Sequence, residues 1–151
     1  MVPWANGLGS TAVIARVPDS DDWAWRLSIA EVVTDGPFSS LPGVDRWIAV
    51  ASGAGMVLTV DGVDTALTVS SGAFAFDGGA STSCHLPDGP VQDLNLMLRR
   101  GSGIGSLEVV TLDAPVSLDG VTACVVLDGE LTVAGAVLTT RDAALAPTGA
   151  A

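Results

Sequence analysis

Short alternating runs of apolar and polar residues, separated by turn signals, cover most of the chain. The apolar positions are rich in Val, Leu and Ile, and no segment has the i, i+3, i+4, i+7 spacing of a capped amphipathic helix. The runs predict β-strands over residues 12–17, 24–33, 46–51, 56–60, 65–69, 73–76, 92–99, 106–112, 121–127, 130–134 and 136–139. Many short strands joined by turns are typical of a β-sandwich or barrel, so the predicted fold class is all-β.

Asp-Gly pairs mark many of the predicted turns and occur six times along the chain. The pair suits the positive φ angles of a type I′ turn, which makes it a strong hairpin signal between two apolar runs. Asp61-Gly62 separates residues 56–60 from residues 63–69 in this way. Asp128-Gly129 similarly follows residues 121–127 and precedes an apolar run. Both stretches are therefore predicted to be β-hairpins.

A faint internal repeat relates two parts of the chain. Residues 67–79 line up with residues 137–149, and each stretch follows a strand, an Asp-Gly turn and a second strand. This rhythm is that of a cupin half-barrel, although repetitive Val, Thr and Gly can imitate a duplication by composition alone. With 151 residues the chain suits one compact domain. We therefore predict a single bicupin-like domain over residues 1–151, with a first half of about 1–100 and a shorter second half of about 101–151.

The chain is strongly acidic, with 17 Asp and Glu against six basic residues, all Arg, and a net charge of -11. Such a surface repels phosphate backbones and anionic lipid, so neither nucleic acid nor a membrane is an expected partner. No apolar run approaches the ~20 residues that span a bilayer. Residues 1–10 do not resemble a signal peptide. Cys84 and Cys124 are expected to be reduced thiols, and the expected location is cytoplasmic.

Two predicted strands gather polar side chains, including arginine, on one face. Alternation along residues 25–30 and 93–99 separates the apolar side chains from the polar ones. The polar faces carry Arg26, Ser28, Asp93, Asn95 and Arg99. These faces either meet water, as antiparallel sheets commonly allow, or line a cup whose guanidinium groups hold a carboxylate.

Two loops are further candidates for a binding site. Residues 35–46 form a long loop with two prolines that ends at Arg46, and Phe38 within it is either a pocket wall or ordinary core. Residues 4–11 form a loop rich in Gly, Asn, Ser and Thr. It is either an ordinary N-terminal loop or a segment that aims backbone N–H groups at an anion. No Lys follows it, so it is not a phosphate-binding P-loop.

The sequence offers little for metal or nucleophilic chemistry. His85 is the only histidine, so a metal site built on a histidine cluster is not expected, and no cofactor is predicted. His85 could serve a Ser-His-Asp set or activate Cys84 or Cys124, but no local pattern supports either arrangement. Asp93 or Glu31 could act as a general base if buried. We predict no catalytic residue and no metal ligand, and an enzymatic activity stays open.

Four blocks of sequence, in their order and spacing, resemble the HutD/Ves family. The blocks are Pro3–Gly7, Trp25–Val32, Asp35–Arg46 and Asp93–Arg100. The resemblance covers roughly residues 2–101, and the remaining fifty residues match only in general character. It implies a bicupin fold of the RmlC-like class, which agrees with the strand pattern and the faint repeat.

The resemblance also implies a ligand site and a biological setting. The family's named member is encoded with histidine-utilisation genes and is regarded as a modulator of that pathway, whereas the Ves branch is linked to cold and stress response. The implied function is non-enzymatic binding of a small carboxylate, such as urocanate or a formylated glutamate derivative, in the modulation of histidine or amino-acid catabolism. By position, the implied ligand-binding residues are Trp4, Asn6, Gly7, Thr11, Arg26, Ser28, Phe38, Ser39, Arg46, Asp93, Asn95 and Arg99.

The chain departs from the family pattern at three positions, Ala5, Leu8 and Val13, where a polar or basic residue, a Gly and an acidic residue are usual. Two other functions therefore stay open. One is a protein-interaction or stress-related protein with a vestigial pocket. The other is a metal-independent cupin isomerase or lyase that uses Asp93 or His85 as its acid or base. A homodimer is compatible with the sequence.

Overall fold

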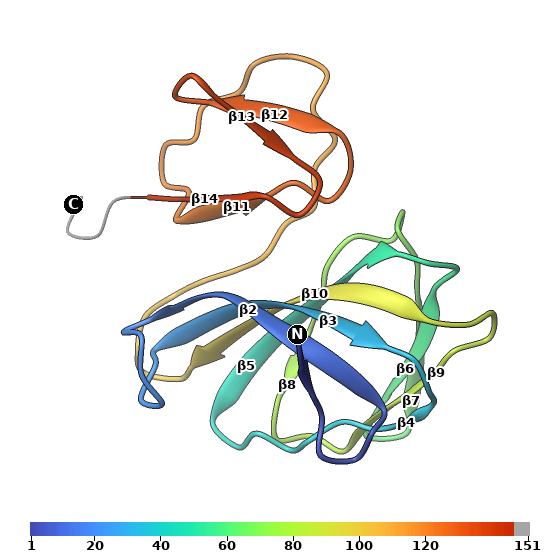
Figure 1. Ribbon diagram of the computed structural model, residues 1–151. Helices are drawn as coiled ribbons and strands as arrows, with labels where there is room; N and C mark the ends of the chain where they lie inside the picture. The colour runs from blue at the N-terminus through green and yellow to red at the C-terminus, as the bar shows by residue number, and fades with distance from the viewer. Residues whose placement is uncertain (147–151) are drawn as a thin grey trace. The chain divides into compact units, whose positions relative to one another are not determined.

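The computed structural model describes residues 1–146, which form fourteen β-strands and no α-helix (Figure 1). The strands pair in antiparallel fashion, so the predicted all-β, cupin-type antiparallel architecture is confirmed. The chain divides into two compact units, residues 1–110 and residues 111–151. The described residues include no helix with the length and apolarity that a membrane crossing requires.

Two antiparallel sheets make up the N-terminal unit. The larger sheet has the strand order β1-β2-β3-β10-β5-β8, which places the long strand β10 between β3 and β5 (Figure 1). Its strands are β1 (Val2–Pro3), β2 (Gly9–Val17), β3 (Trp25–Val32), β5 (Val44–Ser52), β8 (Phe74–Asp77) and β10 (Val91–Arg99). The smaller sheet has the order β4-β9-β6-β7. Its strands are β4 (Gly36–Pro37), β6 (Met56–Val60), β7 (Val63–Leu67) and β9 (Thr82–His85).

Side chains from both sheets form one hydrophobic core, so the two sheets pack face to face. The core consists of Val32, Ile48, Val50, Phe76 and Val91 from the larger sheet and Met56, Leu58, Leu67 and Cys84 from the smaller one. Because side chains alternate along a strand, Arg46 shares the face of β5 that points Ile48 and Val50 into this core. The inner face of the larger sheet therefore carries both the core and, further along the same strands, buried polar groups.

The hairpin predicted around Asp61-Gly62 is confirmed. β6 pairs with β7 so that Val60 lies opposite Val63, and Asp61 and Gly62 adopt φ angles of 47° and 81°. A two-residue turn with positive φ at both positions matches the twist of the flanking strands. Residues 106–112, by contrast, form no strand, so that prediction is wrong. Their Val and Leu residues favour extended backbone, but a strand also needs a neighbour with which to exchange hydrogen bonds.

The described part of the C-terminal unit contains two two-stranded sheets. β11 (Ala123–Val125) pairs with β14 (Ala143–Leu145), and β12 (Glu130–Val133) pairs with β13 (Ala136–Thr139). The hairpin predicted around Asp128-Gly129 is therefore wrong, because β11 pairs with β14 and not with β12. The idea that this unit is a shortened copy of the first one stays a prediction, since its alignment runs into residues 147–151, beyond the described ones.

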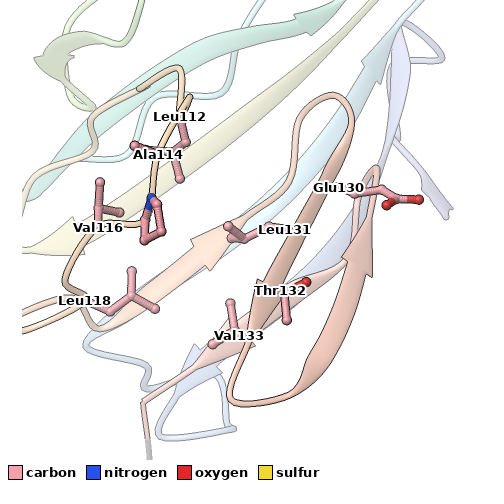
Figure 2. Close-up of a pocket in the computed structure, with 9 residues that line it drawn as sticks. Leu112, Ala114, Val116, Leu118, Glu130, Leu131, Thr132 and Val133 are labelled. Atoms are coloured by element: carbon pink, nitrogen blue, oxygen red, sulfur yellow. The ribbon is translucent and has the colours of Figure 1, made fainter.

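A groove of about 330 Å³ lies within the C-terminal unit (Figure 2). One side comes from the strand-free residues 112–118 and the other from β12. The lining is mostly apolar and includes one charged side chain, Glu130. Figure 2 shows the Glu130 carboxylate at the outer end of the groove, turned away from the apolar side chains. The groove therefore offers no cation to an acidic ligand.

Candidate functional site

The N-terminal unit contains a cavity of about 740 Å³. Strands β2, β3, β5 and β10 supply its floor, and residues 1–6 and 37–41 supply its rim. Ten of the twelve residues proposed from the sequence line it: Trp4, Asn6, Thr11, Arg26, Ser28, Phe38, Ser39, Arg46, Asp93 and Asn95. Segments that are far apart in the sequence therefore meet at one place in the fold.

Strand register explains how the polar side chains come together. Met97 on β10 pairs with Arg26 on β3 and with Arg46 on β5, so the two arginines flank it. Adjacent strands lie about 4.8 Å apart, which separates the two arginine backbones by roughly 10 Å. Asn95 and Asp93 follow on the same face of β10, at two-residue intervals from Met97. The floor of the cavity thus has two cationic side chains at one end and a carboxyl group at the other.

Arg46 is the most deeply buried of the cationic side chains, with 6% of its surface exposed. Its guanidinium carbon lies 5.0 Å from the ring centre of Phe76 and 5.7 Å from that of Phe38. Its Nη2 donates a hydrogen bond of 3.3 Å to Asn95 Oδ1, and its buried Nε has no hydrogen-bond partner in residues 1–146. Burial lowers the pKa of Arg46 to about 10, although the nearby Asp93 partly offsets this effect.

Arg26 is half-buried, and its buried Nε likewise has no hydrogen-bond partner within the described part of the chain. Burial lowers its pKa, and the positive charge of Arg16 adds to this effect. No carboxylate in residues 1–146 forms an ion pair with Arg26 or Arg46. Two guanidinium groups that face the same cavity therefore form no direct ion pair with a surrounding carboxylate that the structure describes.

Two surface arginines of the N-terminal unit, Arg16 and Arg100, differ from the cavity arginines because they pair with carboxylates. Arg16 forms an ion pair with Asp19 at 2.8 Å, and Arg100 lies 2.9 Å from both Asp45 and Asp77. Acidic residues outnumber basic ones by 17 to six, so carboxylates are plentiful. Arg16 and Arg100 thus have carboxylate partners, whereas Arg26 and Arg46 in the cavity have none within ion-pair distance among residues 1–146.

Asp93 and Asn95 are buried next to each other on β10, with 1% and 5% of their surfaces exposed. The Asn95 Nδ2 group donates a hydrogen bond to Asp93 Oδ1, while the Asn95 carbonyl oxygen accepts one from Arg46. The Asn95 amide thus lies between the Asp93 carboxyl group and the Arg46 guanidinium, which form no direct ion pair. Burial raises the pKa of Asp93 to about 7, and the hydrogen bond from Asn95 and the charge of Arg46 both act in the opposite direction.

The N-terminal loop forms a wall of the cavity. Trp4 donates a hydrogen bond of 2.7 Å from its indole Nε1 to Thr11 Oγ1, and its ring meets the ring of Phe38 edge-on at 6.0 Å. The backbone N–H of Gly7 donates to the Trp4 carbonyl, and that of Leu8 donates to Asn6 Oδ1. These two N–H groups are therefore bonded within the loop and are not free to bind an anion.

Two residues proposed from the sequence lie outside the cavity lining, Gly7 and Arg99. Gly7 occupies the turn with a φ angle of 73°. The Arg99 guanidinium stacks on Trp23 at 4.3 Å and donates hydrogen bonds to the backbone carbonyls of Trp23 and Asp21 at 2.7 and 3.0 Å. Arg99 therefore ties the end of β10 to the segment before β3.

The candidates for nucleophilic chemistry also lie away from the cavity lining. His85 is exposed, and its Nδ1 atom lies 2.5 Å from Asp35 Oδ2. Cys84 is a buried free thiol whose pKa burial raises to about 11, and Cys124 is a free thiol on β11 of the C-terminal unit. Within the described residues, no three His, Cys, Asp or Glu side chains group in a way that could hold a metal ion.

Several residues of the site were not found from the sequence. Phe76 stacks on Arg46 from the neighbouring strand β8, because the register places the two directly opposite each other. Met97, Pro37 and Leu41 also line the cavity. Alternation along β10 puts Met97 on the same face as Asp93 and Asn95, although it was not among the proposed ligand-binding residues, whereas nothing in the sequence indicates which strand lies next to β5.

An antiparallel sandwich of two packed sheets, with a polar cavity on its inner face, defines a cupin-type β protein. The chain belongs to the HutD family, whose model matches residues 1–151.

The relatives of the chain agree with this membership. A protein from Pseudomonas putida, described as an uncharacterized 21.2 kDa protein in the hutC 3′ region, is 42% identical over 98 residues, which are 64% of this chain and 52% of that protein. Protein Ves of Cronobacter sakazakii is 36% identical over 98 residues, or 64% of this chain and 54% of that protein. The chain spans about half the length of the curated relatives it matches.

A solved structure is similar over the same share of the chain. HutD from Pseudomonas fluorescens SBW25, described as the formate condition, is 45% identical with a TM-score of 0.62. The match covers 66% of this chain and 55% of that one.

Proposed function

We propose that the cavity of the N-terminal unit binds a small carboxylate without transforming it, and that occupancy of the cavity modulates histidine or amino-acid catabolism. The observation that carries the proposal is the pair of guanidinium groups, Arg26 and Arg46, that face one cavity without a carboxylate partner. A planar guanidinium presents two parallel N–H groups to a carboxylate, which makes arginine the favoured side chain for such a ligand.

The walls of the cavity support an organic acid as the ligand. A volume of about 740 Å³ accommodates a body larger than the carboxyl group itself. Trp4 and Phe38 offer aromatic surface next to the arginines, and Ser28 and Asn95 offer neutral hydrogen-bonding groups. The pathway assignment draws on the histidine-utilisation names of two relatives, the protein in the hutC 3′ region and HutD.

A thermal-shift screen tests the proposal with urocanate, formylglutamate, formiminoglutamate, glutamate and formate at low salt. A ligand at about 100 times its Kd adds about 2.7 kcal/mol to the stability of the protein that binds it. For a domain of this size, the expected rise in Tm is about 5–10 °C. Arg26→Ala and Arg46→Ala should each abolish the shift, whereas the control Arg100→Ala, at an exposed arginine paired with Asp45 and Asp77, should retain it.

The result has three readings. A shift with one carboxylate that is lost in both cavity variants supports the proposal. A flat panel with a folded protein overturns it and favours a protein-interaction role. A shift accompanied by a new compound in the NMR spectrum of the carboxylate overturns the non-enzymatic part, because the protein then transforms its ligand, and Asp93 becomes the first candidate for the acid or base.

A further inference from the structure

Asp93 is a carboxyl group buried in the same cavity that we assign to a carboxylate. It lies on β10 with 1% of its surface exposed and contributes to the cavity lining. Asp93 accepts a hydrogen bond from the neutral Asn95 amide, and no cation in residues 1–146 lies within ion-pair distance of it. An ionised Asp93 would therefore place an unpaired negative charge beside the ligand.

The charged and titratable groups around Asp93 come from the strands on both sides of β10 and from the opposite sheet. Arg46 on β5 reaches it through Asn95, and Arg26 on β3 lines the same cavity. Cys84 on β9 lies close enough to sense its charge and is a neutral thiol, because burial raises its pKa to about 11. Asp35, just before β4, is held by the His85 ring and the Leu86 N–H.

Two carboxylates that share a dry site repel each other strongly unless a proton lies between them or on one of them. Arg26 and Arg46 attract the incoming carboxylate, but they do not remove its repulsion from an ionised Asp93. Protonation of Asp93 removes this repulsion and also creates an O–H donor in the cavity.

We propose that Asp93 sets the charge selectivity of the site: a carboxylate enters together with one proton from the solvent, and that proton rests on Asp93. This inference rests on the proposed function. The cavity then binds a carboxylate together with one proton, whereas an uncharged amide of the same shape would bind without a proton. Asp93 acts as a positioning residue through its charge and not as a catalytic one.

The proton is available near neutral pH, because burial raises the pKa of free Asp93 to about 7. A bound carboxylate raises this pKa further. Above the pKa of the free protein, each ligand must bring a proton, so its Kd rises with pH. The limiting slope is about tenfold in Kd for each pH unit, which corresponds to one proton taken up.

Isothermal titration calorimetry of the full chain tests whether carboxylate binding is coupled to proton uptake, with formate and N-formylglutamate as ligands from pH 6.0 to 8.5. Both ligands stay ionised over this range, so their own titration does not contribute. Runs in two buffers of different ionisation enthalpy count the protons taken up. We expect close to one proton for each ligand at pH 8 and a weakening of about tenfold for each pH unit above 7. Formamide, the uncharged analogue of formate, should take up none.

Two variants separate Asp93 from the other acids. Asp93→Asn keeps the shape and the hydrogen bond with Asn95, and it should bind with no proton uptake and a Kd independent of pH. Asp88→Asn removes an exposed carboxylate from the turn before β10 and should behave as the wild type. The native Trp fluorescence of each variant confirms that it has folded.

The possible failures are distinguishable. Binding of both carboxylates without proton uptake, or with a Kd unchanged from pH 6.0 to 8.5, overturns the role of Asp93 and leaves the carboxylate site standing. Absence of binding at every pH overturns the proposed function itself. If Asp93→Asn does not fold, the ¹³C carboxyl resonance of Asp93 in the wild type decides the matter. Its titration midpoint must rise when formate is added, and an unmoved midpoint overturns the inference.

Discussion

Replacing Arg46 with methionine should make the protein more stable while abolishing carboxylate binding. Arg46 is buried with one hydrogen bond of 3.3 Å and without an ion pair in residues 1–146. Methionine is shorter than arginine but flexible, carries no charge and makes favourable contacts with aromatic rings such as those of Phe38 and Phe76. Buried charges are commonly replaced by apolar residues of similar volume without loss of stability.

The size of the effect follows from two opposing terms. Burial lowers the pKa of Arg46 from its ordinary value to about 10, which corresponds to about 3 kcal/mol of unfavourable free energy in the charged form. The two aromatic rings stabilise the charged form by about 2 kcal/mol in total through cation–π attraction. Arg46→Met should therefore raise the free energy of unfolding by about 1 kcal/mol.

Urea unfolding followed by Trp fluorescence measures this change. All four tryptophans, at positions 4, 23, 25 and 47, belong to the N-terminal unit, so the signal reports the unit that contains the cavity. Arg16→Met is the matched control, because Arg16 lies on the surface and pairs with Asp19, so its effect on the free energy of unfolding should be small. A loss of 1 kcal/mol or more in Arg46→Met alone would refute the reasoning. Arg46 would then be a structural residue.

Two further predictions concern Asp93 and Arg99. Burial raises the pKa of Asp93 from 3.8 to about 7, so the folded protein holds this proton more tightly than the unfolded chain. The resulting stability is fully present below about pH 4 and is lost as the pH rises to about 7; Asp93→Asn should therefore match the wild type in urea unfolding at pH 4 and be more stable at pH 8. Arg99→Ala should lower the free energy of unfolding by about 1–2 kcal/mol, because it removes the Trp23 stack and two hydrogen bonds to carbonyls. It should leave the Kd for carboxylates unchanged, and a loss of binding would place Arg99 in the site.

The fold was predictable where local chemistry decides it. The Asp61-Gly62 hairpin forms because both positions need positive φ angles and the flanking runs are apolar. Asp128-Gly129 carries the same local signal, yet β11 pairs with β14, a strand from much later in the chain. Residues 106–112 have the composition of a strand and no partner within the described part of the chain. Pairing between distant strands is not encoded in a local run of residues, which is why these two predictions failed.

The candidate site was also predictable in part, as far as strand alternation determines which side chains share a face. Alternation along β3 and β10 placed Arg26, Ser28, Asp93 and Asn95 on faces that line one cavity. Alternation also assigned Arg99 to this face, but it lies at the end of β10, where its long side chain reaches the Trp23 ring instead. Burial of the polar face, which gives Asp93 its raised pKa, depends on the packing of the two sheets and could not be derived from strand parity.

The Asn95 amide between Asp93 and Arg46 has a consequence for the mutational history of such a cavity. Codons for Asn and Asp differ by one base, so a single transition could give Asn95→Asp. The new carboxylate would lie where the amide oxygen now accepts the 3.3 Å hydrogen bond from Arg46. It would pair with that arginine, and because the amide donor to Asp93 would be lost, the two buried carboxyl groups would have to share a proton. A single base change at codon 95 would therefore replace the neutral group between Asp93 and Arg46 with a charged one, and the unpaired guanidinium of the cavity depends on that one amide.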